Sequence, residues 1–481
     1  MTGTAAAEGR SWRNSAGAWL GIGTAPGTLV LGAQVGGRHD GALPLVVLVA
    51  GGIVMCALLA AQGRRGLRPP EGENATLAEL SPRYLPPVTD RAVTGLLALA
   101  MIGWFGFNVG LGGGAVAALT GVPDVAGVLV LTVPIVAVLL AGGGRWNAVA
   151  LATTLIAIAL IAVVAVRLAP PSPPVTLSPG GSPLVLAADL AGYIGYVSVF
   201  AVRAPDFTVG LRGRGDLWWC VGLLVGPALA ATVVGAGLAA SSGSTDVVAV
   251  LAGPEGLPVA NLFVAASVIA PTLAAVHSGV FAVRRFSPRL PDWAAVLVLA
   301  VPGTVLAAVR VDRLLLTWLT ILAAVLPALI PPMTAEALRR HRARRALSEG
   351  APPRTDPRPY PERSTDGAAN TDVPAGERGG APSRGARRRV RATAHAPPAN
   401  ATPPDTDGAD GAVARSADAP PAGGARRYVS TWLWAPGAAL ALGLTLAGFT
   451  AAAPAGLAVS SLATVAHSTL TRARGTRRIR S

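Results

Sequence analysis

The sequence predicts an all-α integral membrane protein with about twelve transmembrane helices. Three observations support this: a high apolar content, a low charged content, and long apolar runs that recur along the chain. Of the 481 residues, 52% are hydrophobic and only 14% are charged, whereas a soluble domain carries about 25% charged residues. Apolar runs of about 20 residues have the length that crosses a bilayer. Composition therefore assigns the chain to the membrane class before any motif is considered.

Ten runs of spanning length follow one another through a core at residues 1–335, and Ala and Gly in them favour close helix packing. The predicted spans are 16–36, 43–62, 92–118, 123–142, 147–167, 184–203, 217–240, 258–282, 292–310 and 314–333.

The composition changes after the tenth run. Residues 336–427 are rich in Arg, Pro, Asp and Gly and contain no long apolar run. Such a segment buries too little apolar surface to offset the entropy lost on ordering, so it is predicted to be a disordered cytoplasmic loop. Residues 428–471 hold two more spans, 429–449 and 453–470, and residues 472–481 form a basic cytoplasmic tail.

The arginines predict the topology. All 40 basic residues are Arg, and cytoplasmic loops of membrane proteins are enriched in basic residues. The loops predicted to lie outside hold only Arg38, Arg167, Arg310 and Arg313, whereas the alternate loops hold many more. This asymmetry predicts an inner (plasma) membrane protein with both termini in the cytoplasm. It also accounts for the high pI without a nucleic-acid partner.

Motifs of enzymes are missing from the sequence. There is no HExxH, no GxSxG and no pair of carboxylates within a span, and a chain without Lys cannot form a Walker A motif. Cys56 and Cys220 lie in apolar runs without metal-ligand spacing. We therefore expect neither an enzyme nor an ATP-driven pump, and neither a metal site nor a cofactor.

Two spans contain helix-breaking residues. The first span holds Ala-Pro-Gly-Thr at 25–28, and the sixth ends with Arg-Ala-Pro-Asp-Phe-Thr at 203–208, five helices later. Interrupted helices at matching positions of two halves indicate a transporter binding site. The plainer alternative is a proline kink in one helix and an ordinary end of the other.

Several motifs resemble those of one transporter family. The motifs are Ser-Trp-Arg-Asn-Ser at 11–15, Gly-Trp-Phe-Gly at 103–106, Ala-Pro-Asp-Phe-Thr at 204–208, and the segment from Trp-Leu-Thr to Ile-Pro-Pro at 318–332. In this order they resemble the nucleobase–cation symporters, which include cytosine, purine and hydantoin permeases. The resemblance covers about residues 11–340. It implies two inverted five-helix repeats plus two C-terminal helices.

The resemblance also implies a function and a substrate site. It points to a permease that imports a nucleobase or related planar heterocycle by cation-coupled alternating access. Trp104 would stack on the heterocycle, and Asn108, one helical turn later, would hydrogen-bond it. Gly27 belongs to the unwound backbone of the first span. Tyr196 or Phe200 would supply a second aromatic wall.

The eighth span departs from the family pattern, because the polar cluster expected there has lost its amide and its acid. Ala25, Thr28, Thr272 and Ser278 are the candidate cation ligands. His277 is either a proton-coupling group or a neutral, hydrogen-bonded side chain. The coupling cation is therefore Na+ or H+, and both stay open.

Asp206 is expected to have a structural role, either as a helix cap or as the partner of Arg203 or Arg212. Two alternatives to a heterocycle permease also stay open. One is the same fold carrying an amine or amino acid, and the other is a membrane sensor or scaffold that does not transport.

Overall fold

A computed structural model describes residues 9–141, 143–167, 175–178, 181–254, 257–349, 428–449 and 452–480. Two units separate by their internal contacts, residues 1–343 with 427–481 and residues 344–426. The second is described only over 344–349, the end of helix α15. The first unit is almost entirely helical and carries the site described below.

Six helical segments are long and apolar enough to cross a membrane, so the chain is a multi-pass membrane protein. They are α3 (Leu45–Gly66), α5 (Pro87–Thr120), α8 (Pro183–Thr208), α9 (Arg214–Ser242), the pair α11 (Ala260–Ser267) and α12 (Ile269–Phe286), and the segment Val311–Ala343, which contains α14 (Leu315–Val325) and most of α15 (Ile330–Glu349). Shorter apolar helices lie in α6 (Asp124–Leu140), α7 (Gly143–Arg167), α13 (Asp292–Ala308) and α16 (Ala435–Leu446).

The first predicted span is two helices, α1 (Ala16–Gly23) and α2 (Pro26–Gly37). The other elements are α4 (Leu77–Tyr84), α10 (Val247–Ala252), α17 (Ala452–Arg480) and a pair of two-residue parallel strands, β1 (Leu43–Pro44) and β2 (Val175–Thr176). The prediction did not include α4, α10 or the strands.

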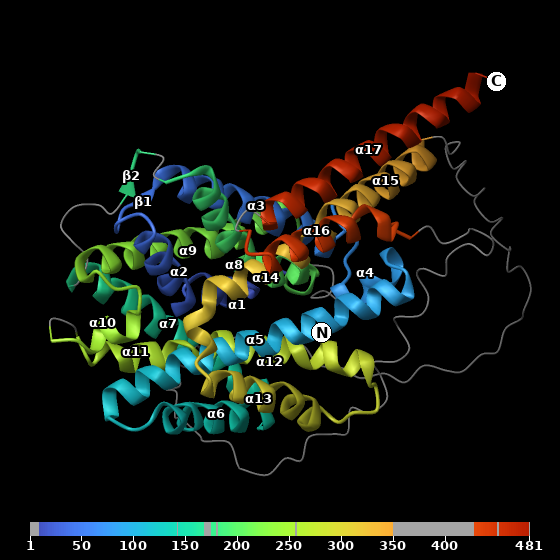
Figure 1. The fold of residues 1–481 in the computed structure, drawn as a ribbon. Helices are drawn as coiled ribbons and strands as arrows, with labels where there is room; N and C mark the ends of the chain where they lie inside the picture. Colours follow the sequence, from blue (N-terminus) through green and yellow to red (C-terminus); the bar gives the residue numbers. More distant parts are fainter. Residues whose placement is uncertain are drawn as a thin grey trace, which may run out of the picture. The chain divides into compact units, whose positions relative to one another are not determined.

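The helices of the two halves of the chain interleave. In one group α2 packs along α9, and α3 packs along α8. In a second group α5 packs against α6, α12 and α13. Figure 1 shows the first group above α5, α12, α13 and α6. The site described below lies where α1, α5, α8 and α12 face one another.

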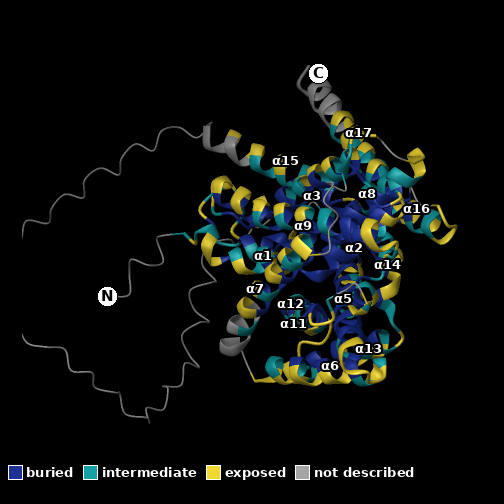
Figure 2. Cartoon of the chain, turned by 90° about the vertical axis from the view of Figure 1, so that its left-hand side faces the viewer, coloured by how far each residue is buried: buried dark blue, intermediate teal, exposed yellow. Residues whose placement is uncertain are grey.

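Glycines permit the close contact between α2 and α9. A Cβ on Gly32 would collide with the carbonyl oxygen of Thr232, and a Cβ on Gly235 would collide with that of Leu29. Small residues at helix interfaces let backbones approach in this way. The buried residues, dark blue in Figure 2, concentrate where helices pack against one another, whereas the outer side of α6 is largely exposed.

Two expectations were wrong. The sixth span is not interrupted, because α8 runs through Pro205 to Thr208. Proline there removes one backbone donor only a turn before the helix ends, and the Thr208 hydroxyl donates to the carbonyl of Ala204. Residues 336–349, predicted to be disordered, continue α15. For the basic tail at 472–481 no conformation was predicted, and it continues α17 up to Arg480. Most of the predicted loop, 350–427, lies outside the described residues.

Ion pairs connect helices at the end opposite the arginine-rich loops. Asp189, fully buried in α8, pairs with Arg38 and His39 after α2, both at 2.6 Å. In a second group Arg310, which precedes α14, pairs with Asp124 at 2.6 Å and with Asp312 at 2.9 Å. The topology itself remains the prediction made from the arginines.

Candidate functional site

The site is built around the interruption between α1 and α2. Helix α1 ends at Gly23 and α2 begins at Pro26, so the backbone at Thr24 and Ala25 is not helical. The last carbonyls of a helix lack partners within the helix. That of Ile22 accepts the Ala25 N–H at 3.2 Å and the Tyr196 hydroxyl at 2.6 Å. Tyr196 of α8 thus joins its helix to the end of α1.

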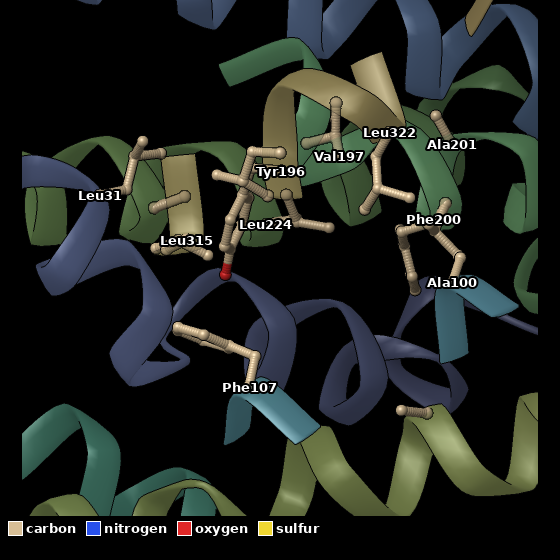
Figure 3. Close-up of a cluster of buried hydrophobic side chains, with 14 of the residues drawn as sticks. Leu31, Ala100, Phe107, Tyr196, Val197, Phe200, Ala201, Leu224, Leu315 and Leu322 are labelled. Atoms are coloured by element: carbon tan, nitrogen blue, oxygen red, sulfur yellow. The ribbon is translucent and has the colours of Figure 1, made fainter. Parts of the chain in front are cut away.

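Three aromatic rings from two helices meet next to this interruption. Trp104 of α5 has its ring centroid 5.7 Å from that of Phe107 and 5.8 Å from that of Tyr196, edge to face in both cases. Figure 3 shows Phe107 and Tyr196 projecting toward one another near the dark-blue ribbon of α1 and α2. A Cβ on Gly27 would lie 3.0 Å from Phe107 Cε1 and 3.7 Å from Tyr196 Cε2. Glycine therefore lets the backbone of α2 approach both rings.

A cavity of about 80 Å³ lies between α1, α2, α5, α8 and α12. A cavity needs about 10–15 Å³ to hold one water, so this cavity has room for a solute as large as several waters. Its walls are largely apolar or aromatic, and its polar side chains are few. The lining residues with polar side chains are Trp104, Asn108, Tyr196, Arg203 and Ser278.

A larger hollow of about 730 Å³, here called the vestibule, adjoins the cavity. The two spaces share lining residues, among them Ile22, Arg203 and Ser278. The vestibule is also lined by Arg10 and Ala78, which lie at the end of the helices where the arginine-rich loops are found. The cavity is therefore approached from the end predicted to be cytoplasmic.

The structure brings most of the predicted site residues together. The cavity lining includes Ala25, Gly27, Trp104, Asn108, Tyr196, Phe200 and Ser278. Of the two alternatives for the second aromatic wall, Tyr196 contacts Trp104, whereas Phe200 packs edge-on against Trp19 with centroids 4.8 Å apart. His277 lines the vestibule instead of the cavity. The roles predicted for these residues stay predictions.

Two of the predicted cation ligands lie outside the cavity lining. Thr28 and Thr272 are fully buried, and each hydroxyl donates to a carbonyl of its own chain segment, that of Ala25 at 2.7 Å and that of Val268 at 2.6 Å. Their oxygens keep lone pairs that a cation could use. The Ala25 carbonyl already accepts from both the N–H and the hydroxyl of Thr28, which makes it the weakest candidate.

Asp206 has the structural role expected of it, since it caps a helix and pairs with Arg203. Its Oδ2 accepts from Arg203 Nε at 2.9 Å, and its Oδ1 accepts from the N–H of Leu77 at 2.7 Å. Leu77 is the first residue of α4, so Asp206 caps a helix that precedes it in the sequence. The carboxylate thereby ties the end of α8 to the start of α4.

The sequence analysis missed Arg203 and Phe207, which line both the cavity and the vestibule. From the sequence alone, Arg203 is a candidate only for pairing with Asp206. An arginine at the end of an apolar run is ordinarily attributed to the positive-inside pattern. The signal that could have found Phe207 is helical spacing, because residues 196, 200, 203 and 207 recur every three or four positions and share one face of α8.

No family model and no curated protein matches the chain. The fold is similar to that of solved structures of Mhp1. One is described as Mhp1, a nucleobase-cation-symport-1 family transporter, in a closed conformation with bromovinylhydantoin bound. Its sequence is 18% identical to this chain and the TM-score is 0.55, and the match covers 70% of this chain and 80% of that chain. The other is an inward-facing conformation of Mhp1, at 17% identity and a TM-score of 0.55, over 70% of this chain and 78% of that chain. The chain therefore has an Mhp1-like fold.

Proposed function

We propose that the protein is a secondary transporter that imports a nucleobase or related planar heterocycle by alternating access. One observation carries the proposal: an interrupted helix meets Trp104, Asn108 and Tyr196 at a small cavity that adjoins a vestibule at one end of the helices. Transporter sites are commonly formed by interrupted helices near the midplane of the bilayer. The fold shared with Mhp1 supports the transporter class.

The lining chemistry supports a flat, polar-edged substrate. Aromatic walls stack on planar rings, and such stacking contributes about 1–3 kcal/mol per base in nucleic-acid complexes. Asn108 is 2% exposed and lines the cavity, and its amide makes no hydrogen bond within the described part of the chain. An amide both donates and accepts, so it can bond the edge of a heterocycle. In the proposed cycle the bound ring is reached from the vestibule in this conformation, and the helix groups then rearrange to expose it to the other side.

Cation coupling is part of the proposal. Thr28, Thr272 and Ser278 offer oxygens for Na+, and His277, on the vestibule wall, offers a group that can carry a proton. A substrate affinity that depends on Na+ at constant pH would identify sodium, and one that depends on pH without Na+ would identify protons.

The test is a ligand-binding and uptake experiment with a matched pair of variants. Purified protein is screened by thermal shift against nucleobases, hydantoins and allantoin, since a ligand that binds the folded state raises its melting temperature. Hits are tested for uptake into proteoliposomes. Trp104→Ala should weaken binding about 5- to 150-fold, the equivalent of a 1–3 kcal/mol stacking contribution. Trp293→Ala is the control, because Trp293 is 58% exposed on α13, away from the cavity.

Unchanged affinity in Trp104→Ala would refute the site. Uptake of an amine or amino acid, with no heterocycle bound, would replace the substrate class. Binding without uptake under any gradient would favour a sensor that does not transport.

A further inference from the structure

Arg203 is a buried cationic side chain on the wall of the cavity, near the end of α8. It is 8% exposed and lines both the cavity and the vestibule. Its Nε and Nη2 both reach Asp206 Oδ2, at 2.9 and 2.8 Å. Its Nη1 is buried and has no hydrogen-bond partner among the described residues. One edge of the guanidinium is thus occupied, and Nη1 still has hydrogens to donate.

A buried donor without a partner is costly, and more so when it is charged. Asp206 does not supply the missing acceptor, since it meets the guanidinium through Nε and Nη2, and its other oxygen accepts from the N–H of Leu77 at 2.7 Å. Among the described residues, no Asp or Glu lines the cavity. An acceptor for Nη1 can be supplied by a solute or a water that enters the cavity.

The surroundings also favour negative charge. The charged residues described on the vestibule wall are Arg10, Arg203 and Asp206. Asp206 is paired with Arg203, so Arg10 adds an excess of positive charge along the approach. An excess of positive charge along a cleft attracts ligands of negative charge. Among the described residues that line the cavity itself, Arg203 is the only charged one, and a positive wall disfavours amines and other cations.

We propose that Arg203 recognises the substrate directly, and that the substrate is a planar ring carrying an anionic acceptor, with a carboxylate as the best match. This inference rests on the proposed function and narrows its substrate class. The ring lies among Trp104, Tyr196 and Phe200, and its acidic group faces Arg203. Guanidinium groups suit this task because they form strong charge-assisted hydrogen bonds with carboxylates.

The test compares rings that differ only in the acidic group. Calorimetry and thermal shift on the full-length protein at pH 7 use orotate against uracil, and nicotinate against nicotinamide. We expect the carboxylate member of at least one pair to bind about tenfold tighter or more, as expected for a hydrogen bond to a charged group. Arg203→Gln should abolish that preference. Arg203→Lys, which keeps the charge and loses the planar fork, should keep part of it.

The control is Arg64→Gln, an exposed arginine at the same end of the helices, which should leave the preference intact. Neutral rings that bind as tightly as their carboxylate partners, or a preference that survives Arg203→Gln, would overturn the inference and leave the proposed function standing. If Arg203→Gln does not fold, the wild-type ratios and Arg203→Lys decide the question. If no heterocycle, charged or neutral, binds the wild type, the proposed function fails and the inference fails with it.

Discussion

The hydroxyl of Tyr196 joins α8 to the end of α1, and Tyr196→Phe removes only this link. Its oxygen lies 2.6 Å from the carbonyl oxygen of Ile22, near the usual length for such a bond. Phenylalanine keeps the ring beside Trp104. The substitution therefore separates the hydroxyl's contribution to the helix interruption from the ring's contribution to the cavity.

The expected cost follows from what the Ile22 carbonyl keeps. A typical intramolecular hydrogen bond contributes about 0.5–1.5 kcal/mol net, and a buried group left unsatisfied costs a further 1–3 kcal/mol. The Ile22 carbonyl still accepts the Ala25 N–H at 3.2 Å, so it is not left without a partner. We therefore expect Tyr196→Phe to lower the free energy of unfolding by about 1 kcal/mol.

Tyr193 provides a matched control one turn earlier on the same helix. It is 1% exposed, and its hydroxyl lies 3.4 Å from Thr232 Oγ1, beyond the usual range for an O–H···O bond. Tyr193→Phe should cost less than about 0.5 kcal/mol. The assay is reversible unfolding in mixed detergent micelles, with ligand affinity measured in parallel. Equal costs for the two variants, or a larger cost at Tyr193, would show that the link to α1 does not stabilise the interruption.

Two further predictions concern packing and charge. A Cβ on Gly103 would overlap the indole ring of Trp318, so Gly103→Ala should lower the free energy of unfolding by about 1–3 kcal/mol through overpacking. A Cβ on Gly222 would have no neighbour within 4 Å, so Gly222→Ala should be neutral or stabilise by up to about 1 kcal/mol. Thermal unfolding compares the two variants, and similar melting temperatures would contradict the packing. The side chain of Asp312 is 4% exposed and that of Asp124 is 42% exposed, and both pair with Arg310. Asp312→Ala should therefore cost about 1–3 kcal/mol, because Arg310 loses its hydrogen bonds to a buried carboxylate and keeps only Asp124. Asp124→Ala should cost less than about 1 kcal/mol, and unfolding in detergent that shows the reverse order would refute this.

Most of the helical framework could be predicted from the sequence, because apolar length is a strong signal. The runs predicted at 43–62 and 217–240 correspond to α3 (Leu45–Gly66) and α9 (Arg214–Ser242), and the interruption predicted at 25–28 appears at Thr24 and Ala25. The errors fall where hydropathy says little. Helix α4 is short and amphipathic, although the capping box of Thr76 and Glu79 that opens it was readable as a helix start.

The site was only partly predictable, because contacts between distant segments leave no local trace. Trp104 and Asn108 share a helix face by their spacing. In contrast, nothing local shows that Asp206 caps α4 or that Arg203 keeps one nitrogen unpaired. The expected break at Pro205 was wrong because the cost of a proline depends on how much helix follows it, and here only Asp206, Phe207 and Thr208 do.

The interleaving of the two halves has a consequence for how the protein is made. Helices α2 and α3 bury their faces against α9 and α8, which lie more than a hundred residues later in the chain. At about 5–20 residues per second, on the order of ten seconds separate the insertion of the early helices from the arrival of their partners. During that interval the glycine-lined face of α2 must lie against lipid or against the insertion machinery. The cavity between α1, α2, α5, α8 and α12 can therefore form only after the second half of the chain has entered the membrane.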